Sequence, residues 1–372
     1  MLRMCIIQDE LMPGGKTGVI FKLIEILNKY DIIPDLYSYD TGKIANVTKS
    51  KNIQFNFKKV TDFGIKRFTY YKNYFLLRLI SNKLQNYDFI FNSTHCLNKN
   101  IFPNKLVNYI HYLYPLEYSE PKFLKISLSR KLYLLPLRWL NRDHSRNKSK
   151  YGLVVANSSF TKKKIEEWYP SQKNKVQVIY PPVNIKYFWN EQNNRSNQVI
   201  SVGNFEPQKD QLTQIKIAKF FPNIKFIITG FVNFKFRRDY YNKCLNYVKH
   251  LNVKNVILKP NLGKEELRLL LQKSKYFIHT RKNEHFGISI VEAIAAGCIP
   301  LVHDSGGQRE IVPFEIFRFR SIADAVIKFK KILKLDINYT RKKFQQYIQK
   351  FSEERFEDNI IRLIKHFYNT SR

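Results

Sequence analysis

Two glutamates in the segment RKNEHFGISIVEAIAAGCIPLVHDSGG, residues 281–307, have a spacing that suits the binding of a polar ligand. Glu284 falls in a predicted loop, and Glu292, eight positions later, falls about one turn inside a predicted helix that Gly297 terminates. Two carboxylates so placed could accept hydrogen bonds from hydroxyl groups at separated points of one extended ligand. For either glutamate taken alone, a solvated helix or loop residue is the alternative.

The start of that helix would supply backbone donors between the two acids. The amides of a first helical turn have no partner inside the helix, and the helix dipole favours negative charge at this end. Phe286, Gly287 and Ile288 stand where the loop meets the helix, so amides here are expected to face an anionic or polar group of the ligand.

A lysine in an earlier loop is placed for an anionic group. The stretch SVGNFEPQKDQ, residues 201–211, is typical of a strand followed by a glycine, a loop and a helix start, and it contains Asn204 and Lys209. Lys209 is well placed to meet a phosphate beyond the end of the strand. A solvated loop lysine is the alternative interpretation.

The loop MPGGKTG, residues 12–18, follows the first predicted strand and precedes a helix expected to begin near Gly18. Gly14 and Gly15 would let the backbone approach a ligand closely, next to helix amides that favour anions. The spacing matches neither the G-x-G-x-x-G fingerprint nor a P-loop. A plain tight turn explains these glycines about as well.

His111 ends the predicted strand KLVNYIH and is followed by YLYP. A histidine at the carboxyl end of a parallel strand points towards the edge at which ligands bind, where it could donate a hydrogen bond to a substrate. A satisfied structural histidine is the alternative, and His279 and His303 occupy similar positions in the sequence.

Short apolar runs alternate along the chain with longer amphipathic ones, which is typical of parallel sheets with crossover helices. The predicted strands are residues 4–7, 87–93, 105–111, 151–158, 176–180, 198–203, 225–230, 255–260, 276–280 and 298–303. The helical patterns include residues 18–30, 161–168, 264–273 and 288–296. Ser158 or Ser159 would cap the second of these. The predicted fold class is α/β, with doubly wound parallel sheets.

A domain boundary is expected within YPPVNIKYFWNEQNNRSNQ, residues 180–198. Two prolines interrupt regular structure there, and a polar stretch precedes the strand that restarts the alternating pattern. We therefore predict two Rossmann-like domains, residues 1–182 and 183–349, with a C-terminal helix, 350–372, packing back on the first. Ligands of such sheets bind beyond the carboxyl ends of the strands, in the loops considered above.

The 372-residue chain carries 64 Lys and Arg against 30 Asp and Glu, a formal net charge of +34. Such a field attracts an anionic partner, whether nucleic acid, acidic lipid or a phosphorylated substrate, although a merely solvated lysine-rich surface is the alternative. A content of 44% hydrophobic and 15% aromatic residues excludes a disordered chain. The four cysteines, at positions 5, 96, 244 and 298, have no metal-type or redox-type spacing and are interpreted as reduced thiols.

The expected location is the cytoplasm, at the cytoplasmic face of a membrane. No apolar run approaches the roughly 20 residues that span a bilayer, and the opening MLRMCII meets polar residues too early for a signal peptide. Residues 121–150 hold nine Lys and Arg and one acid, Asp143, interleaved with leucines and Trp139. This mixture suits docking on an anionic membrane. A pair of ordinary helices with a buried apolar face is the alternative.

Taken together, these segments resemble the retaining glycosyltransferases of family 4, the glycosyl transferases group 1, which have the GT-B fold. The resemblance rests on NEHFGISIVEAIAAG followed by HDSGGQREIV, and it extends over nearly the whole chain through MPGGKTG, VVANSSFT, VIYPPV, SVGNFEPQKD, FIITG and LGKEELRLLLQKSKYFIHT. Within the family, NEHFG, YIHY and NSSFT look most like the ALG-eleven-type α-1,2-mannosyltransferases. That group extends a dolichol-diphosphate oligosaccharide with GDP-mannose.

The resemblance implies a nucleotide-sugar donor, GDP-mannose or a UDP-sugar, held mostly by the C-terminal domain across an interdomain cleft. Glu292 would bind the ribose hydroxyls and Lys209 the diphosphate. Glu284, with the amides of Phe286 and Gly287, would contact the transferred sugar or its phosphate side.

From the N-terminal domain, His111 and the Gly14–Gly15 loop would close the cleft, so that His111 and Glu284 would be the catalytic residues. The resemblance also implies retention of the anomeric configuration by front-face attack, with fixed cations and helix termini stabilising the leaving diphosphate. It implies no metal and no cofactor besides the donor.

The chain departs from the family at one point. Members usually carry an arginine directly after the glycine of the GxxxPxK loop or three positions after it, where this chain has Asn204 and Glu206. A phosphate-binding cation is therefore missing. We hypothesise that Arg281 or Lys282, just before Glu284, replaces it.

The sequence thus favours a membrane-associated retaining glycosyltransferase that moves a hexose, foremost mannose, to a lipid-linked or glycan acceptor. A UDP-sugar-dependent enzyme with a soluble acceptor is the first alternative. A nucleic-acid-binding protein is the second, although positive charge explains affinity and not the paired glutamates. A catalytically silent relative is the third.

Overall fold

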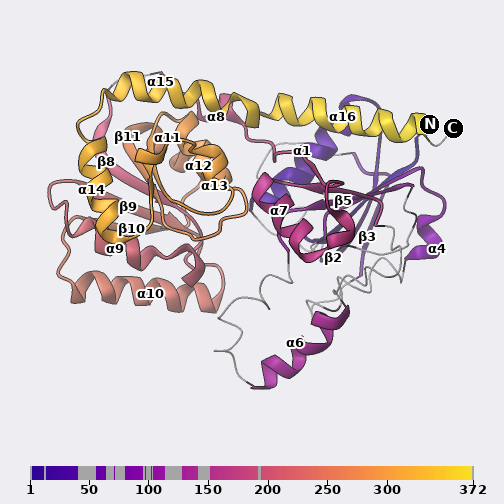
Figure 1. Cartoon of the computed structure of the whole chain (residues 1–372), viewed down its shortest axis with the longest axis horizontal. Coiled ribbons are helices and arrows are strands. Elements are labelled where there is room, and N and C mark those ends of the chain that lie inside the picture. Colours follow the sequence, from indigo (N-terminus) through magenta and orange to yellow (C-terminus); the bar gives the residue numbers. More distant parts are fainter. Residues whose placement is uncertain are drawn as a thin grey trace. The chain divides into compact units, whose positions relative to one another are not determined.

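The computed structural model describes residues 2–11, 14–40, 56–63, 71, 80–94, 97, 102, 104–113, 128–140, 151–191 and 194–370. The chain divides into two compact units (Figure 1). Unit 1 comprises Met1–Pro182 together with Glu354–Arg372, and unit 2 comprises Val183–Glu353. Each unit is built around one parallel sheet with helices on both faces.

The sheet of unit 1 has the strand order β3-β2-β1-β4-β5-β6-β7 within the described residues, and every pairing is parallel. The strands are β1 (Met4–Glu10), β2 (Asp35–Asp40), β3 (Lys59–Asp62), β4 (Phe89–Asn92), β5 (Leu106–Ile110), β6 (Leu153–Ala156) and β7 (Gln177–Val178). The chain runs outward from β1 to β3 and then returns to the other side of β1, so the strand order reverses between β1 and β4.

The central strands of this sheet are buried on both faces, to which their side chains point alternately. In β1, Met4 and Ile6 belong to one hydrophobic cluster, whereas Cys5 and Ile7 belong to another. The strands of such a sheet are expected to be continuous apolar runs, and the run MCII is one.

The last helix, α16 (Glu353–Thr370), completes the first of these clusters. Its apolar side chains recur at helical spacing and are buried among residues of β1, β4 and α1 (Gly15–Lys29): Phe356, Ile360, Leu363, Ile364 and Phe367. The Phe367 ring packs edge-on against Phe89, with 5.3 Å between ring centroids. Each such side chain contributes about 1.5–3 kcal/mol of burial free energy, so α16 is a structural part of unit 1.

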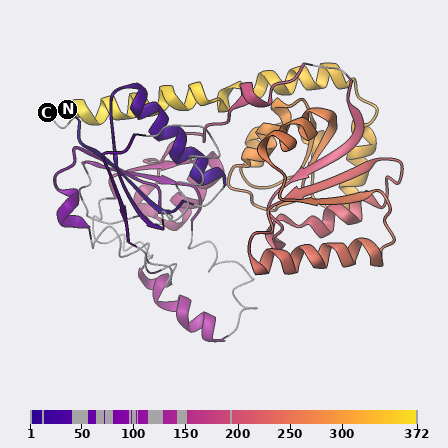
Figure 2. The ribbon, with the colours of Figure 1, turned by 180° about the vertical axis from the view of Figure 1, so that it is seen from behind.

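The sheet of unit 2, seen from behind in Figure 2, is again entirely parallel. Its strand order is β10-β9-β8-β11-β12-β13 within the described residues. The strands are β8 (Ser196–Val202), β9 (Lys225–Gly230), β10 (Val256–Pro260), β11 (Ser274–His279), β12 (Ile299–His303) and β13 (Arg318–Phe319). Here the strand order reverses between β8 and β11.

The other helices are α4 (Ser81–Leu84), α6 (Leu128–Leu140), α7 (Ser159–Trp168), α8 (Ile185–Phe188), α9 (Gln211–Ala218), α10 (Lys235–His250), α11 (Lys264–Lys273), α12 (Ile288–Ala295), α13 (Gln308–Ile311), α14 (Ile322–Ile332) and α15 (Ile337–Tyr347). The part of the chain that the structure describes also contains four 3₁₀ turns: Pro170–Gln172, Pro207–Lys209, Glu315–Phe317 and Ile348–Phe351. No helix in the described part of the chain is both long and apolar enough to cross a membrane.

The structure confirms the α/β class with two doubly wound sheets. It also confirms the cap of α7, where the Ser158 hydroxyl accepts a hydrogen bond from the Thr161 amide at 3.0 Å. The predicted start of α1 near Gly18 is wrong. The helix begins at Gly15, because the Gly18 amide already donates to the Gly14 carbonyl oxygen at 3.0 Å.

The described cysteines, Cys5, Cys244 and Cys298, are free and buried, and burial raises the pKa of each thiol. Cys96 lies outside the described residues.

Candidate active site

The loops that follow β8 and β11 lie next to each other at the point where the strand order of unit 2 reverses. In doubly wound sheets this reversal opens a crevice at the carboxyl edge, and ligands bind there. The first loop carries Asn204 and Lys209, and the second carries Arg281 and Glu284. Helix α12, which carries Glu292, follows the second loop directly.

The Glu284 carboxylate is the centre of a charged cluster. Lys209 Nζ donates to its Oε2 at 2.7 Å, and His279 Nε2 lies 3.3 Å from the same oxygen. Arg281 Nη1 lies 3.3 Å from Oε1, and the His285 amide donates to Oε1 at 3.2 Å. The Lys209 and Glu284 side chains are only 19% and 10% exposed, so water screens this pair weakly.

These neighbours fix the charge of Glu284. Burial by itself would raise the pKa of the carboxyl group, but the Lys209 and Arg281 charges and the hydrogen bond from His279 hold this pKa well below its usual value. Burial lowers the pKa of His279 more than Glu284 raises it, so the imidazole is neutral near pH 7. Two cations and one carboxylate leave a net positive charge for an anionic ligand.

A buried threonine ties the two loops together. Thr280, the first residue after β11, donates from its hydroxyl to the Lys209 carbonyl oxygen at 2.9 Å and accepts from Gln214 Nε2 at the same distance. Gln211 Nε2 donates to the Asn204 carbonyl oxygen at 2.9 Å. The positions of the Lys209 and Glu284 backbones are therefore set by hydrogen bonds that need no ligand.

The loop after β12 braces the Glu284 loop from the other side. The Gly307 amide donates to the Glu284 carbonyl oxygen at 2.7 Å, and the Ser305 hydroxyl accepts from the Asn283 amide at 2.9 Å. A Cβ atom on Gly307 would lie 2.2 Å from the His285 carbonyl oxygen, closer than atoms can approach. The pair Gly306–Gly307 is thus required for this close packing of backbones.

The turn into α12 also requires glycine. Gly287 has φ of 110°, a conformation that side chains strongly disfavour, and its added Cβ atom would lie 2.7 Å from Ile290. Phe286 before it is buried and packs edge-on against Phe351, with 5.2 Å between ring centroids. No side chain caps the helix in front of Ile288.

Glu292 has no ion pair or side-chain hydrogen bond among the described residues. Burial raises its pKa to about 7, and the distant Lys264 offsets this only in part. A carboxylate held without a partner beside a ligand crevice is an available hydrogen-bond acceptor. Hydrogen-bond donors of a bound ligand would stabilise the ionised form of the Glu292 carboxyl group.

The two positions at which the chain departs from the family differ in the structure. Asn204 is half-buried beside Gly203. Glu206 accepts from Arg237 Nε at 2.7 Å, with Arg237 only 16% exposed. The acid that replaces an arginine is therefore paired with an arginine from α10.

The candidate residues of unit 1 lie at the corresponding edge of the other sheet. Gly14 precedes α1 at the reversal between β1 and β4, and nothing lies within 4 Å of a Cβ atom placed on it. Gly15 is the first residue of the helix, whose first turn has no side-chain cap. His111 follows β5, and its Nε2 atom lies 3.0 Å from Ser93 Oγ at the end of β4.

The sequence did not predict the polar residues whose hydrogen bonds position the site residues and their loops. His279 was considered only for its position, and Ser93, Thr280 and Ser305 were not considered. Each of them immediately follows a strand or ends one, apart from Ser305, which lies two residues beyond β12. A search of all polar side chains at strand ends would have found most of them.

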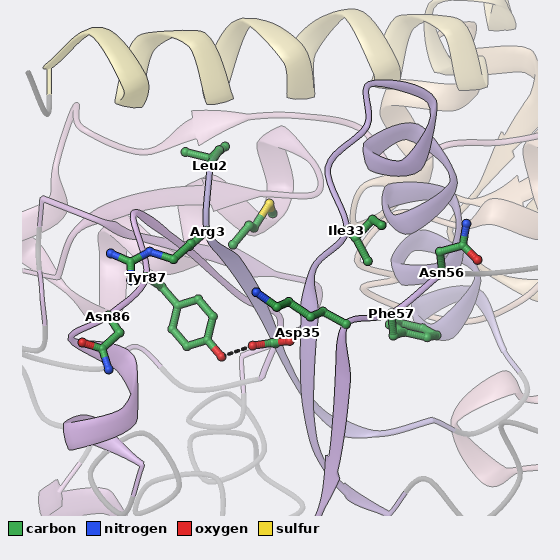
Figure 3. Close-up of a pocket in the computed structure, with 10 residues that line it drawn as sticks. Leu2, Arg3, Ile33, Asp35, Asn56, Phe57, Asn86 and Tyr87 are labelled. Carbon is green, nitrogen blue, oxygen red and sulfur yellow. Dashed lines mark hydrogen bonds between the residues drawn. The ribbon is translucent and has the colours of Figure 1, made fainter.

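A cavity of about 870 Å³ lies in unit 1, away from these residues (Figure 3). Its lining comes from the amino-terminal ends of β1, β2, β3 and β4: Leu2, Arg3, Met4, Ile33, Asp35, Asn56, Phe57, Lys58, Asn86 and Tyr87. The Tyr87 hydroxyl donates to Asp35 there. This edge of the unit 1 sheet is opposite to the one that carries Gly14 and His111.

Comparison with known proteins identifies unit 2. The family model described as glycosyl transferases group 1 matches residues 185–351. This part of the chain, nearly all of unit 2, is similar to the group 1 glycosyltransferases. The match is to the glycosyl transferases group 1 that the sequence predicted, and the matched residues contain the whole cluster around Glu284 as well as Glu292.

One relative of the chain is "GDP-Man:Man(3)GlcNAc(2)-PP-Dol alpha-1,2-mannosyltransferase" of Dictyostelium discoideum. It is 29% identical over 243 residues, which are 59% of this chain and 48% of the relative. The chain spans about half the length of the curated relatives it matches.

Two solved structures share the fold across both units. A glycosyltransferase from Rickettsia africae has a TM-score of 0.70 and 16% identity, and it covers 99% of each chain. Anabaena HepE in complex with UDP and glucose has a TM-score of 0.71 and 17% identity over 98% of this chain and 100% of HepE. These likenesses confirm the GT-B fold, in which the group 1 domain is the second unit.

Proposed function

We propose that this chain is a retaining glycosyltransferase that moves mannose from GDP-mannose to a lipid-linked oligosaccharide. The observation that carries the proposal is the cluster of Lys209, Arg281 and Glu284 at the strand-order reversal of a group 1 domain, with the unpaired Glu292 eight residues further on. The names of the relatives supply the donor and the acceptor class.

In this proposal the two cations and the start of α12 hold the diphosphate. Lys209 and Arg281 already lie at one carboxylate, so they offer a concentrated positive charge where the leaving group becomes more negative. The amides at Gly287 and Ile288 add donors aligned with the helix dipole. Glu292 accepts hydrogen bonds from the ribose hydroxyls.

Glu284 stays ionised throughout, because its pKa is held well below neutrality. It therefore acts as a hydrogen-bond acceptor for sugar hydroxyls and a positioner of Lys209, and not as a proton donor. His111, oriented by Ser93, would donate a hydrogen bond to the sugar from unit 1.

The transfer step balances without a further reagent. The oxygen of an acceptor hydroxyl attacks the anomeric carbon on the face from which the diphosphate departs, the bond from that carbon to the phosphate oxygen breaks, and the acceptor proton passes to the leaving phosphate oxygen. The products are the extended glycan, with its configuration retained, and GDP.

Arg281 is the better of the two hypothesised replacements for the missing arginine. Its guanidinium shares Glu284 with Lys209, and its side chain is 17% exposed, whereas Lys282 is exposed to solvent. A cation held beside Lys209 can contact the same diphosphate.

We also propose that residues 121–150 dock on an anionic membrane. Residues 121–127 and 141–150 lie outside the described residues, but α6 between them exposes Leu128, Leu132 and Leu135 by 72%, 63% and 57%. Their spacing places them on one face of the helix, which favours docking over a buried apolar face. Sedimentation with vesicles tests this, and no preference for anionic over neutral vesicles would contradict it.

The test of the enzymatic proposal is calorimetric titration with GDP-mannose, UDP-glucose and UDP-N-acetylglucosamine, on the wild type and on Glu292→Ala. We expect selective binding of GDP-mannose that the substitution weakens. Selective binding of a UDP-sugar would replace the donor in the proposal. Absence of binding to all three would overturn the proposal.

A further inference from the structure

The segment after β9 exposes three phenylalanines within six residues. Phe231 and Phe234 are 38% exposed and Phe236 is 55% exposed, on the loop before α10 and on its first turn. Leaving a phenylalanine side chain in water forgoes about 1.5–3 kcal/mol that burial would provide. Scattered apolar residues are ordinary on surfaces, but a cluster marks a site of interaction.

The rings of this cluster are held in a defined arrangement. Phe234 and Phe236 stack at an interplanar angle of 10° with 5.9 Å between centroids. The Arg237 guanidinium carbon lies over both rings, 4.9 Å and 5.5 Å from their centroids. Because Arg237 also binds Glu206, the aromatic cluster is fixed to the loop that carries Lys209.

The helix that continues from the cluster is basic. The sequence of α10, KFRRDYYNKCLNYVKH, has five Lys and Arg and one acid. Lys235, Arg238, Lys243 and Lys249 are exposed, and the helix buries little besides Tyr240 and Cys244. Exposed aromatic residues beside a row of cations are the combination that favours the interface of an anionic bilayer.

We propose that Phe231, Phe234 and Phe236, with the basic face of α10, form a docking surface for an anionic lipid bilayer on the donor-binding unit. The inference rests on the proposed function, since a lipid-linked acceptor requires the group 1 domain to work at a membrane. It adds a contact made by unit 2 itself, separate from residues 121–150 of unit 1.

The composition of the surface favours a bilayer over an aromatic ligand such as a nucleobase. Arg237 already covers the stacked rings, whereas a bound base would need an open ring face. The rings also lack the hydroxyl or indole N–H that commonly anchors aromatic residues in polar interfaces. Insertion into the apolar layer of a bilayer would bury such rings, and lipid phosphates would form ion pairs with the neighbouring cations.

The test compares the full chain with the double variant Phe234→Ser and Phe236→Ser. Serine at 234 preserves the start of α10, because this residue is the N-cap in an extended conformation. Phe220→Ser is the matched control, since Phe220 is 56% exposed but follows α9, outside the cluster. The probes are sedimenting vesicles of phosphatidylcholine alone and of phosphatidylcholine mixed with phosphatidylglycerol.

We expect the double variant to lose about tenfold in partitioning to the anionic vesicles, because binding scales with the apolar area inserted. Phe220→Ser should partition as the wild type does. A second double variant, Phe234→Trp and Phe236→Trp, should retain binding, because tryptophan favours the membrane interface. GDP-mannose affinity, measured by calorimetry on the same samples, should be unchanged in all variants.

Three results would overturn the inference. The double serine variant could bind vesicles as well as the wild type, or it could lose no more than the Phe220→Ser control. It could also lose donor affinity while keeping vesicle binding, which would assign the rings to the donor site. Failure of the proposed function gives a different result, namely a wild type that sediments with anionic vesicles but binds no nucleotide-sugar.

Discussion

Glu284 and Glu292 belong to one short segment of unit 2, yet their surroundings are opposite. Glu284 is contacted by two cations and an imidazole, and its pKa is held well below the usual value. Glu292 is half-buried, without an ion pair or side-chain hydrogen bond among the described residues, and burial raises its pKa to about 7. Burial raises the pKa of both carboxyl groups, so the difference comes from the neighbours of Glu284, first the Lys209 and Arg281 charges and then the hydrogen bond from His279.

The comparison separates two tasks that a sugar-nucleotide site must perform. A carboxylate with a fixed charge organises the loops around it before any ligand arrives, and this organisation is a large part of electrostatic catalysis. A carboxylate without a partner stabilises nothing in the empty protein, but it gains its hydrogen bonds when the ligand binds. Removing the first should therefore damage the protein, whereas removing the second should damage only ligand binding.

The largest effect is expected from Lys209→Ala. The substitution removes the closest cation from Glu284 and, in the proposed function, from the leaving diphosphate. The rate of transfer should fall about a hundredfold or more. The free energy of unfolding should fall by about 2 kcal/mol, because a partly buried carboxylate loses a partner. Initial rates and urea unfolding would measure the two effects.

Lys219→Ala is the control for this experiment, since Lys219 is an exposed lysine at the end of α9. Lys219→Ala should change neither the rate of transfer nor the free energy of unfolding. If Lys209→Ala left both the rate and the stability as they are, the cluster would have no role in organising the site.

Glu292→Gln should separate binding from stability. Donor affinity should fall about tenfold to a hundredfold, because hydrogen bonds to a charged acceptor are replaced by weaker ones. The folded protein should become more stable, because an unpaired charge in a half-buried position is removed. Calorimetry and urea unfolding on the same variant would show the two changes in opposite directions. A loss of stability would mean that Glu292 has a partner in the folded protein.

The raised pKa of Glu292 also predicts a pH dependence. A folded pKa of about 7 lies above the ordinary glutamate value of 4.5, so ionisation costs stability as pH rises from 4.5 to 7. The stability advantage of Glu292→Gln should therefore be about 2 kcal/mol larger at about pH 8 than at about pH 5. In the wild type, donor affinity should increase through the same range as the carboxylate forms. An identical advantage of the variant at both pH values would contradict the assignment.

The smallest effect is expected from Arg281→Ala, compared with Lys282→Ala. Arg281 shares Glu284 with Lys209, so its removal should lower donor affinity about fivefold, while Lys209 retains most of the phosphate contact. The exposed Lys282 should have little effect when it is replaced. Calorimetry with GDP-mannose compares the two, and unchanged affinity in Arg281→Ala would end the hypothesis that this residue replaces the missing arginine.

The sequence predicted the two glutamates better than it predicted their neighbours. Local turn and helix signals are enough to place Glu284 in the loop before α12 and Glu292 on α12 itself. The contact between Lys209 and Glu284 joins residues 75 positions apart, and it depends on β8 lying beside β11. Strand order is set by tertiary packing, which a single sequence does not encode locally.

The strands that were not predicted show the same limit. The sequence of β2, DLYSYD, has acids at both ends and a serine in the middle, so it lacks the apolar run expected of a buried parallel strand. The strand forms because Leu36, Tyr37 and Ser38 are nonetheless buried against neighbours on both faces. The strands β3 and β13 are short and equally polar.

The return of α16 to unit 1 has a consequence for the order in which the protein is synthesised. The core of unit 1 lacks Phe356, Ile360 and Phe367 until the ribosome has passed all of unit 2. Unit 2 is continuous in sequence and can close its own core first. Although unit 1 is translated earlier, the apolar surface that α16 covers stays exposed until α16 has been synthesised. We expect the nascent chain to need protection from aggregation during that interval.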